Sequence, residues 1–291
     1  MTKTLAILLA AVALGASPMA QATAISTSHL GFADFAITPG SGALKLMGDW
    51  WLQSYAEARN SKGDLAQAFA DNFFGGMEVE QGNAQASYSA ELFSVAADAV
   101  VPWAQARAEA TDESSPPPGL DIAAPVQTNV LVPGCQPKWA TGVARSDLFN
   151  GFMVTGGTGT VEVTFSVDLG GQKTVATDPC GLLAWAELTF TLEIYDLLPV
   201  LEDQSLQDQV VLFHKNRLEC DGPNCFKEEI VDKMLTATRV VEYGKLYSFV
   251  VETDDEQYAM VPVPPTLLLA LLGLAVLPRA GRVAGAWRRT L

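Results

Sequence analysis

The sequence predicts an all-β protein whose body is a single β-sandwich of jelly-roll-like form. Two observations carry this prediction: several segments alternate strictly between apolar and polar residues, and turn-forming residues separate those segments. The clearest segment covers residues 160–168, where Val and Phe alternate with Thr, Glu, Ser and Asp. Alternation of this kind buries one face of a sheet and leaves the other in water, so two sheets must pack together.

Further strands follow from the same pattern in the second half of the chain. They are expected at residues 149–154, 187–195, 239–243 and 246–252. Gly244 and Lys245 separate the last two segments and predict a tight β-hairpin there. Glycine pairs at 156–157 and 170–171 are expected to form the turns on either side of the 160–168 strand.

The first half of the body has a weaker pattern. Strands are expected within residues 26–38 and 44–55, and in the Ala-rich segment 84–110 with a break at Pro102. Residues 64–74 predict a short helix or a loop insertion, and residues 111–119, with three consecutive prolines, predict a loop or linker. We expect residues 23–260 to form one extracellular domain rather than two.

Residues 1–22 predict a signal peptide. A short basic start precedes an apolar run at residues 5–15, which is too short for a stable membrane anchor. Ala20 and Ala22 then give the small-x-small pattern that a signal peptidase accepts. We expect cleavage after Ala22; cleavage after Ala24 and an uncleaved anchor helix are the alternatives.

Residues 261–291 carry a second membrane-directed signal. It opens with Val261, Pro262 and Pro264, and the prolines of this stretch fit neither a helix nor the centre of a sheet. An almost pure Leu, Ala, Gly and Val run follows at residues 267–277 and predicts a short hydrophobic helix in the membrane. Four arginines come after it: Arg279, Arg282, Arg288 and Arg289. Because basic residues stay on the cytoplasmic side, the body is expected outside the inner membrane.

The three parts of this tail resemble the PEP-CTERM family of sorting signals, in which a Val-Pro-x-Pro motif precedes a short hydrophobic helix and a terminal Arg cluster. The resemblance implies an exosortase, a membrane cysteine protease that cuts near the motif and releases or transfers the body. Val263 stands where the family usually has Glu, and the arginines are spread out rather than packed beside the helix. The alternative is an ordinary single-pass tail anchor with the same outward-facing body.

The charge of the chain is strongly acidic and unevenly distributed. The two end segments hold 5 of the 18 basic residues and none of the 33 acidic ones, so the body carries 13 − 33 = −20. So acidic a body repels phosphate backbones, and we therefore expect no nucleic-acid partner. It suits a solvated extracellular protein, with the collection of divalent cations as the alternative. We separately expect extracellular polysaccharide as a partner.

The cysteine content predicts disulfides, because an even number of cysteines in an exported chain favours a disulfide framework. The four cysteines are Cys135, Cys180, Cys220 and Cys225. The last two enclose four turn-forming residues and are expected to close a local loop, which leaves the first two to pair; three pairings are open in principle. His29 and His214 lie far from the cysteines in sequence, so we expect no zinc site.

The residue types of hydrolytic enzymes do not form a recognisable constellation. No Gly-x-Ser-x-Gly motif accompanies the two histidines, and we expect His214 on the surface or on an edge strand. Glu162, Asp168, Glu187 and Glu193 are the candidates for paired catalytic carboxylates. They fall on the polar faces of strands, where solvation alone explains them, so we expect no catalytic pair. The acidic run 252–256 and the group Glu202, Asp203 and Asp208 lack calcium-loop spacing and are expected as solvated turns.

Trp50, Trp51 and Trp103 are candidates for stacking on sugar rings, or for packing in the core. If Trp50 and Trp51 lie on one strand, they point to opposite faces and one of them meets solvent. We expect a structural or adhesive protein of a Gram-negative cell envelope or extracellular matrix, not an enzyme, and no cofactor. The alternatives are a secreted carbohydrate-binding sandwich and a secreted hydrolase with paired carboxylates.

Overall fold

The computed structural model describes residues 22–73, 77–90, 93–114, 120–196 and 209–262, and its elements in these ranges are β-strands. The strands form two antiparallel sheets of eight strands each. The all-β prediction is therefore confirmed for the body, and the arrangement is consistent with the predicted β-sandwich.

The strand order in each sheet is as follows. The first sheet contains β15 (Cys225–Glu242), β12 (Thr160–Thr177), β1 (Ala22–Pro39), β10 (Val126–Pro133), β8 (Ala104–Asp112), β7 (Ser94–Val101) and β6 (Ala84–Ser89), with β9 (Ile122–Ala123) paired to β8. The second sheet contains β14 (Gln209–Asp221), β13 (Leu183–Asp196), β16 (Leu246–Val261), β11 (Lys138–Thr155), β3 (Trp51–Asn60), β4 (Leu65–Asp71) and β5 (Met77–Gln81), with β2 (Ala43–Leu46) paired to β11.

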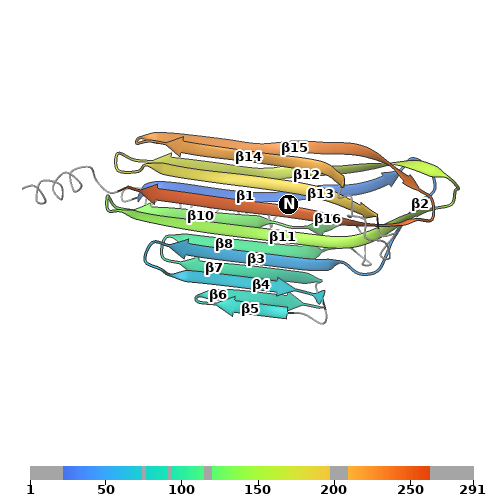
Figure 1. Ribbon diagram of the computed structural model, residues 1–291, viewed down its shortest axis with the longest axis horizontal. Helices are drawn as coiled ribbons and strands as arrows, with labels where there is room; N and C mark the ends of the chain where they lie inside the picture. Colours follow the sequence, from blue (N-terminus) through green and yellow to red (C-terminus); the bar gives the residue numbers. More distant parts are fainter. Residues whose placement is uncertain (1–21, 74–76, 91–92, 115–119, 197–208, 263–291) are drawn as a thin grey trace, which may run out of the picture.

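The molecule is an elongated sandwich in which the two sheets lie face to face (Figure 1). Four of its strands, β1, β11, β12 and β15, each have 18 residues. At about 3.3 Å per residue such a strand is roughly 60 Å long. The first strand of the body, β1, lies between β12 and β10, and the last, β16, lies between β13 and β11.

The core follows from the period-two alternation. On β12 the predicted inward residues Val163 and Phe165 are fully buried, as are Leu188 and Phe190 on β13. Aromatic side chains fill the space under β1, β11, β12, β13 and β16, whereas the core under β3, β4, β7 and β8 is mainly alanine. The Ala-rich segment that gave an ambiguous pattern therefore forms strands, and its break falls at Pro102 and Trp103, as predicted.

Two of the predicted turns are wrong. Gly170 and Gly171 lie inside β12, which continues unbroken to Thr177. A side chain at Gly171 would come within 2.6 Å of the carbonyl of His29 on β1, so the glycine permits close approach of two strands rather than a turn. The expected hairpin at Gly244 is also absent, because β15 and β16 belong to different sheets and the turn crosses between them.

Two further expectations are corrected. Residues 64–74 do not form a helix or an insertion: residues 65–71 are strand β4, whose alternate alanines face the core. The acidic run 252–256 is not a solvated turn, because it lies in the middle of the central strand β16. Its residues therefore alternate between the outer face and the core, and Asp255 points inward with no exposed surface.

Asp255 joins the two sheets through a buried hydrogen-bond network. Its carboxylate accepts hydrogen bonds from the Ser28 hydroxyl on β1 at 2.5 Å and from the Thr128 hydroxyl and N–H on β10 at 2.9 and 3.0 Å. The Gln257 amide, on the same face of β16, donates to the Ser28 hydroxyl and to the Thr128 carbonyl. Burial raises the pKa of Asp255 to about 7, although the hydrogen bonds from Ser28 and Thr128 oppose the rise.

This shift predicts that the protein loses stability as the pH rises from 3.8 to about 7. The folded pKa of Asp255 lies above its ordinary value of 3.8, so between these values the folded state binds a proton that the unfolded state does not. The contribution of Asp255 to the free energy of unfolding is complete below the unfolded pKa and is lost by the time the pH passes about 7. The free energy of unfolding falls in this range by at most about 1.4 kcal/mol per pH unit.

Urea unfolding of the oxidised protein at several pH values measures this slope. The slope is proportional to the difference in bound protons between the folded and unfolded states, and Asp255→Asn is expected to reduce that difference by about one proton, whatever its effect on absolute stability. Asp168→Asn, on the outer face of β12, is the control and is expected to keep the wild-type slope. An Asp255→Asn variant with an unchanged slope would contradict the assignment.

Candidate functional site

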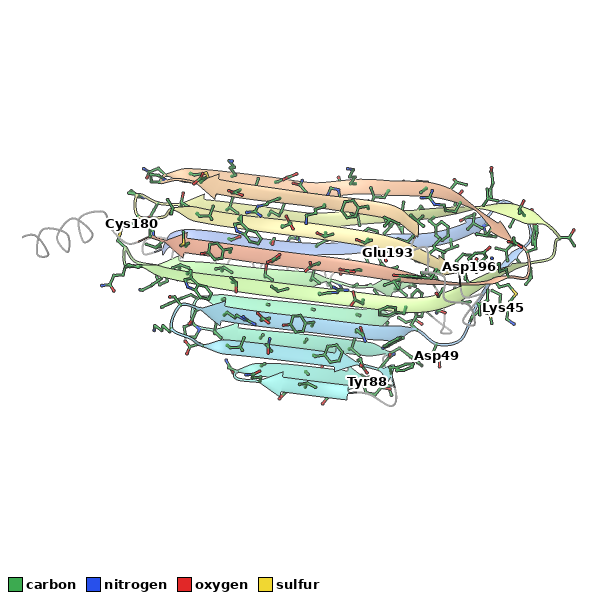
Figure 2. All side chains as sticks on the ribbon, in the orientation of Figure 1. Lys45, Asp49, Tyr88, Cys180, Glu193 and Asp196 are labelled. Carbon is green, nitrogen blue, oxygen red and sulfur yellow. A yellow bond between two sulfur atoms is a disulfide. The ribbon has the colours of Figure 1, made fainter. Side chains whose placement is uncertain are left out.

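Both ends of the described chain lie at one end of the sandwich, which we call the tail pole. β1 begins there and β16 ends there, beside the turns 134–137, 178–182 and 222–224 (Figure 1). Cys180 lies at this pole, whereas Lys45 and Asp196 lie at the opposite one (Figure 2).

The tail pole carries both disulfides. Cys135–Cys180 links the β10–β11 turn to the β12–β13 turn, with the Cα atoms 5.2 Å apart, and Cys220–Cys225 closes the β14–β15 turn at 5.6 Å. The predicted pairing is confirmed. Two disulfides are typical of a protein that folds in an oxidising, extracytoplasmic compartment.

The segment predicted to carry the sorting motif begins inside the fold. Val261 is the last residue of β16, is 2% exposed, and pairs with Lys138 on β11. Pro262 follows at the surface of the pole and is half-buried. Ala22 is the first residue of β1. Ala20, Pro264 and the arginines Arg279, Arg282, Arg288 and Arg289 lie outside the described residues.

Trp50 and Trp51 point in opposite directions, as predicted. Trp50 is 2% exposed in the core, and Trp51 stands on the outer face of the second sheet. The Trp51 ring stacks on Phe149 on the neighbouring strand and on Phe73, with centroid separations of 4.8 and 4.3 Å. These two contacts occupy the ring that a sugar would need, so Trp51 forms no open stacking platform.

Trp103 is also covered. It occupies a left-handed conformation with φ of 81° in the β7–β8 turn at the tail pole. The ammonium groups of Lys62 and Lys138 lie 4.7 and 5.0 Å from the centre of its ring. These cation–π contacts hold two neighbouring turns against the indole. Trp103 therefore serves the packing of the pole.

The outer face of β16 carries two carboxyl groups, of Glu252 and Asp254, whose pKa values burial raises above their ordinary values. Asp254 is flanked on its strand by Glu252 and Glu256, and burial together with these two charges raises its pKa to about 6. Arg145 on β11 lies beside them and binds Asp147 at 3.0 Å and Glu252 at 3.1 Å. The guanidinium of Arg145 thus neutralises part of an acidic row. Its ion pair with Glu252 also links β11 to β16 on their outer side.

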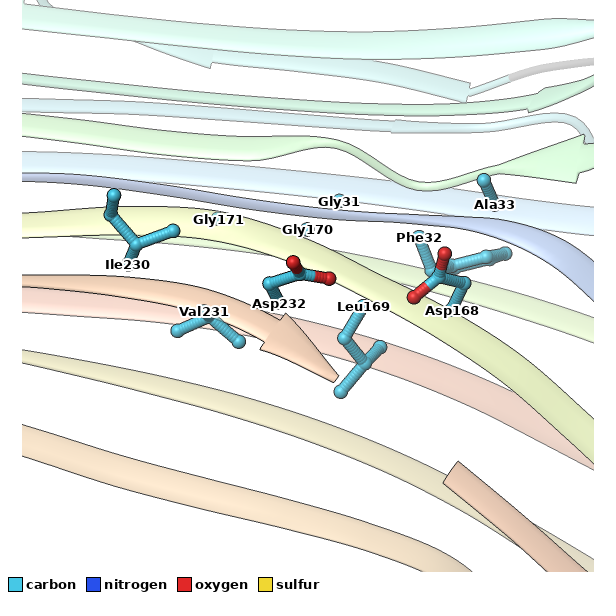
Figure 3. A pocket seen from close by; sticks show the side chains of 10 residues that line it. All are labelled: Gly31, Phe32, Ala33, Asp168, Leu169, Gly170, Gly171, Ile230, Val231 and Asp232. Carbon is cyan, nitrogen blue, oxygen red and sulfur yellow. The ribbon is translucent and has the colours of Figure 1, made fainter. Parts of the chain in front are cut away.

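A hollow lies on the outer face of the first sheet, and its chemistry differs from that of the acidic row on β16. Gly31 on β1 and Gly170 on β12 lie opposite each other, and a side chain at either would meet open space. The resulting depression of about 490 Å³ is bordered by Asp168, Asp232 and Ile230 (Figure 3). It offers two carboxylates, exposed backbone and one apolar side chain that is 72% exposed.

The remaining carboxylates and histidines that were considered for catalysis or metal binding lie on different strands. Glu162, Asp168, Glu187 and Glu193 lie on outer faces, as the strand pattern predicted. His214 lies on the edge strand β14, and His29 lies on the outer face of β1 in the other sheet. Among the described residues no three His, Cys, Asp or Glu side chains converge as metal ligands.

The part of the chain that the structure describes contains no helix of the length and hydrophobicity needed to cross a membrane.

Comparison with known proteins gives no assignment: no protein-family model matches the chain, and no curated protein matches it in sequence.

Sequence reasoning missed the hollow because it interpreted Gly170 and Gly171 as a turn. The available signal was the period-two pattern of β12, which resumes beyond the glycines with the inward Val175. With a continuous strand, the parity of Asp168 and Gly170 places both on the outer face.

The ring contacts of Trp51 predict a structural role that can be measured. Trp51→Ala is expected to lower the free energy of unfolding by about 3 kcal/mol, because it removes two stacked neighbours and half-buried surface. Trp139→Ala, on the same sheet face but 37% exposed, is the matched control and is expected to cost about 1 kcal/mol. Equal losses in denaturant unfolding would contradict the structural assignment.

Proposed function

We propose that this protein is exported across the inner membrane of a Gram-negative bacterium and serves as a structural or adhesive protein of the cell envelope or extracellular matrix. In this proposal a signal peptidase removes residues 1–22, and residues 261–291 hold the jelly-roll-like body at the membrane. An exosortase-type protease then cuts near Val261, Pro262 and Pro264. The proposal describes a non-enzymatic protein that needs no cofactor.

The observation that carries the proposal is the short distance between the fold and the apolar tail. β16 ends at the buried Val261, and the apolar run begins at Leu267, so five residues, 262–266, separate them. Five extended residues span at most about 17 Å. With the tail in the bilayer, the tail pole would face the membrane closely and the sandwich would extend away from it.

The composition of the body supports the same conclusion. A net charge of −20 on the body favours solvation outside the cell, and both disulfides stabilise the pole from which the tail leaves. Strands of 18 residues make a long, rigid body, which suits a protein that spans or joins layers of the envelope.

A truncation tests the proposal without damaging the fold. A chain ending at Pro262 retains all of β16, whereas removal of Val261 as well would take a buried residue from the core. We expect the full-length chain to float with inner-membrane vesicles and the truncated chain to appear in the soluble exported fraction. Coexpression of an exosortase is expected to shorten only the full-length chain, and Pro264→Ala is expected to reduce this cleavage.

If tagged full-length and truncated chains have the same location, the anchoring proposal fails. If they differ in location but no exosortase shortens the full-length chain, the tail is a retained anchor and the sorting step fails.

A second candidate function, carbohydrate binding, is favoured by the hollow at Gly31 and Gly170. Asp168 and Asp232 can accept hydrogen bonds from sugar hydroxyls there, and Ile230 offers an apolar contact. Gly170→Leu places an apolar side chain in the hollow, and its Cβ atom has no neighbour within 4 Å. Binding of an extracellular polysaccharide by the wild type and its loss in Gly170→Leu would support this function; a wild type that retains no glycan on an array would remove it.

A further inference from the structure

The two edge strands β14 and β15 form a seam that backbone hydrogen bonds do not close. They follow each other in the chain but belong to different sheets. Side chains of β15 cross the seam: the Lys227 ammonium donates to the Glu219 carbonyl at 2.6 Å, and the Arg239 guanidinium donates to the Val210 carbonyl at 3.0 Å. We call this boundary the β14–β15 seam.

Three side chains meet at this seam: the buried Lys173, and Glu229 and Asn216, which are partly buried. Lys173 on β12 lies directly opposite Glu229 on β15, and its ammonium nitrogen is 3.2 Å from Oε2 of Glu229. The other oxygen of the same carboxylate, Oε1, accepts a hydrogen bond from Nδ2 of Asn216 on β14. One carboxylate therefore touches an amine of the first sheet and a carboxamide of the second.

The environment of Lys173 is unusual for a lysine. Its side chain has no exposed surface, and among the described residues its nitrogen makes no well-directed hydrogen bond. It interrupts an inward row that continues with the fully buried Val175. Burial lowers the pKa of Lys173, although Glu229 and Asp255 oppose this effect. A lowered pKa favours the neutral amine, which carries the lone pair of a nucleophile.

We propose that Lys173 and Asn216 become joined by an isopeptide bond, and that Glu229 transfers the protons. Nζ of Lys173 attacks Cγ of Asn216, and a new C–N bond forms. The bond from Cγ to Nδ2 breaks, and that nitrogen leaves as ammonia. The products are a secondary amide and ammonia, so the reaction requires no oxidant, metal or cofactor.

The contacts of Glu229 match the two proton transfers that this reaction needs. The carboxylate first takes a proton from Nζ, which lies next to Oε2. It then donates a proton to Nδ2, which already contacts Oε1 and must leave as ammonia. The leaving nitrogen and the attacking nitrogen are therefore held by the same acid–base group.

The bond would connect β12 to β14 and thus close the edge of the sandwich covalently. It would act with Cys220–Cys225, which closes the end of the same seam at the tail pole. This inference concerns the body alone and does not depend on how the tail is processed.

Intact mass spectrometry of the purified full-length chain tests the proposal. After the N-terminus is defined by sequencing, the wild type is expected to be one ammonia lighter than a chain with two disulfides. Trypsin should then fail to cut after Lys173 and should yield the dipeptide Asn216-Arg217 attached to the Lys173 side chain. Wild-type protein at full mass after prolonged incubation would overturn the proposal, as would an ammonia loss that maps to other residues.

Variants assign the roles of the three side chains. Lys173→Arg and Asn216→Ala are expected to show no loss of ammonia from their own calculated masses, and Glu229→Gln is expected to form the bond many times more slowly or not at all. Lys233→Arg, four residues from Glu229 on the same inward-facing row of β15, is the matched control and is expected to form the bond normally. Chains without the bond should melt roughly 10 °C lower, because the cross-link restricts the unfolded state.

Discussion

The structure depends on one constraint: the first and the last strands of the body are central strands of the two sheets. β1 lies between β12 and β10, and β16 lies between β13 and β11. Asp255 on β16 accepts hydrogen bonds from Ser28 on β1 and from Thr128 on β10, so the first and last described strands meet across the core. Neither sheet is complete until residues near both ends are present. In an exported chain, folding would therefore finish only after residue 261 has emerged, immediately beside the apolar tail.

The edges of the sandwich are stabilised differently from its centre. The central strands have ladder partners on both sides, whereas β14 and β15 each have a partner on one side only. An unpaired strand edge is a template for pairing with other chains, and inward-pointing charges are a common protection. On β15 the inward row contains Lys227, Lys233 and Arg239, which fit this role. Cys220–Cys225 and the Lys173, Glu229 and Asn216 contacts hold the same edge from within.

Much of the fold was predictable because period-two alternation is a local property. It located β12 and β13, and the cysteine spacing gave both disulfides. Strand β4 was missed because Leu, Ala, Gln and Phe alternate without a polar row, and alanine favours helix in isolation. The turn at Gly244 was misassigned because sequence does not show which sheet a strand joins. The Lys173 site could not be predicted from the sequence because its three side chains come from three strands whose register is set by the fold. The lysine in an otherwise apolar row was the one usable signal.

The slowest-opening part of the molecule is expected in β1 and β16, and native-state hydrogen exchange of the intact, oxidised protein measures this most directly. Amides in the middle of both strands are expected to exchange only through global unfolding, whereas those of the short strands β5 and β6 exchange through local opening. Exchange from β16 as fast as from β5 would contradict the account, because the last strand would then be a peripheral addition to a body that folds without it.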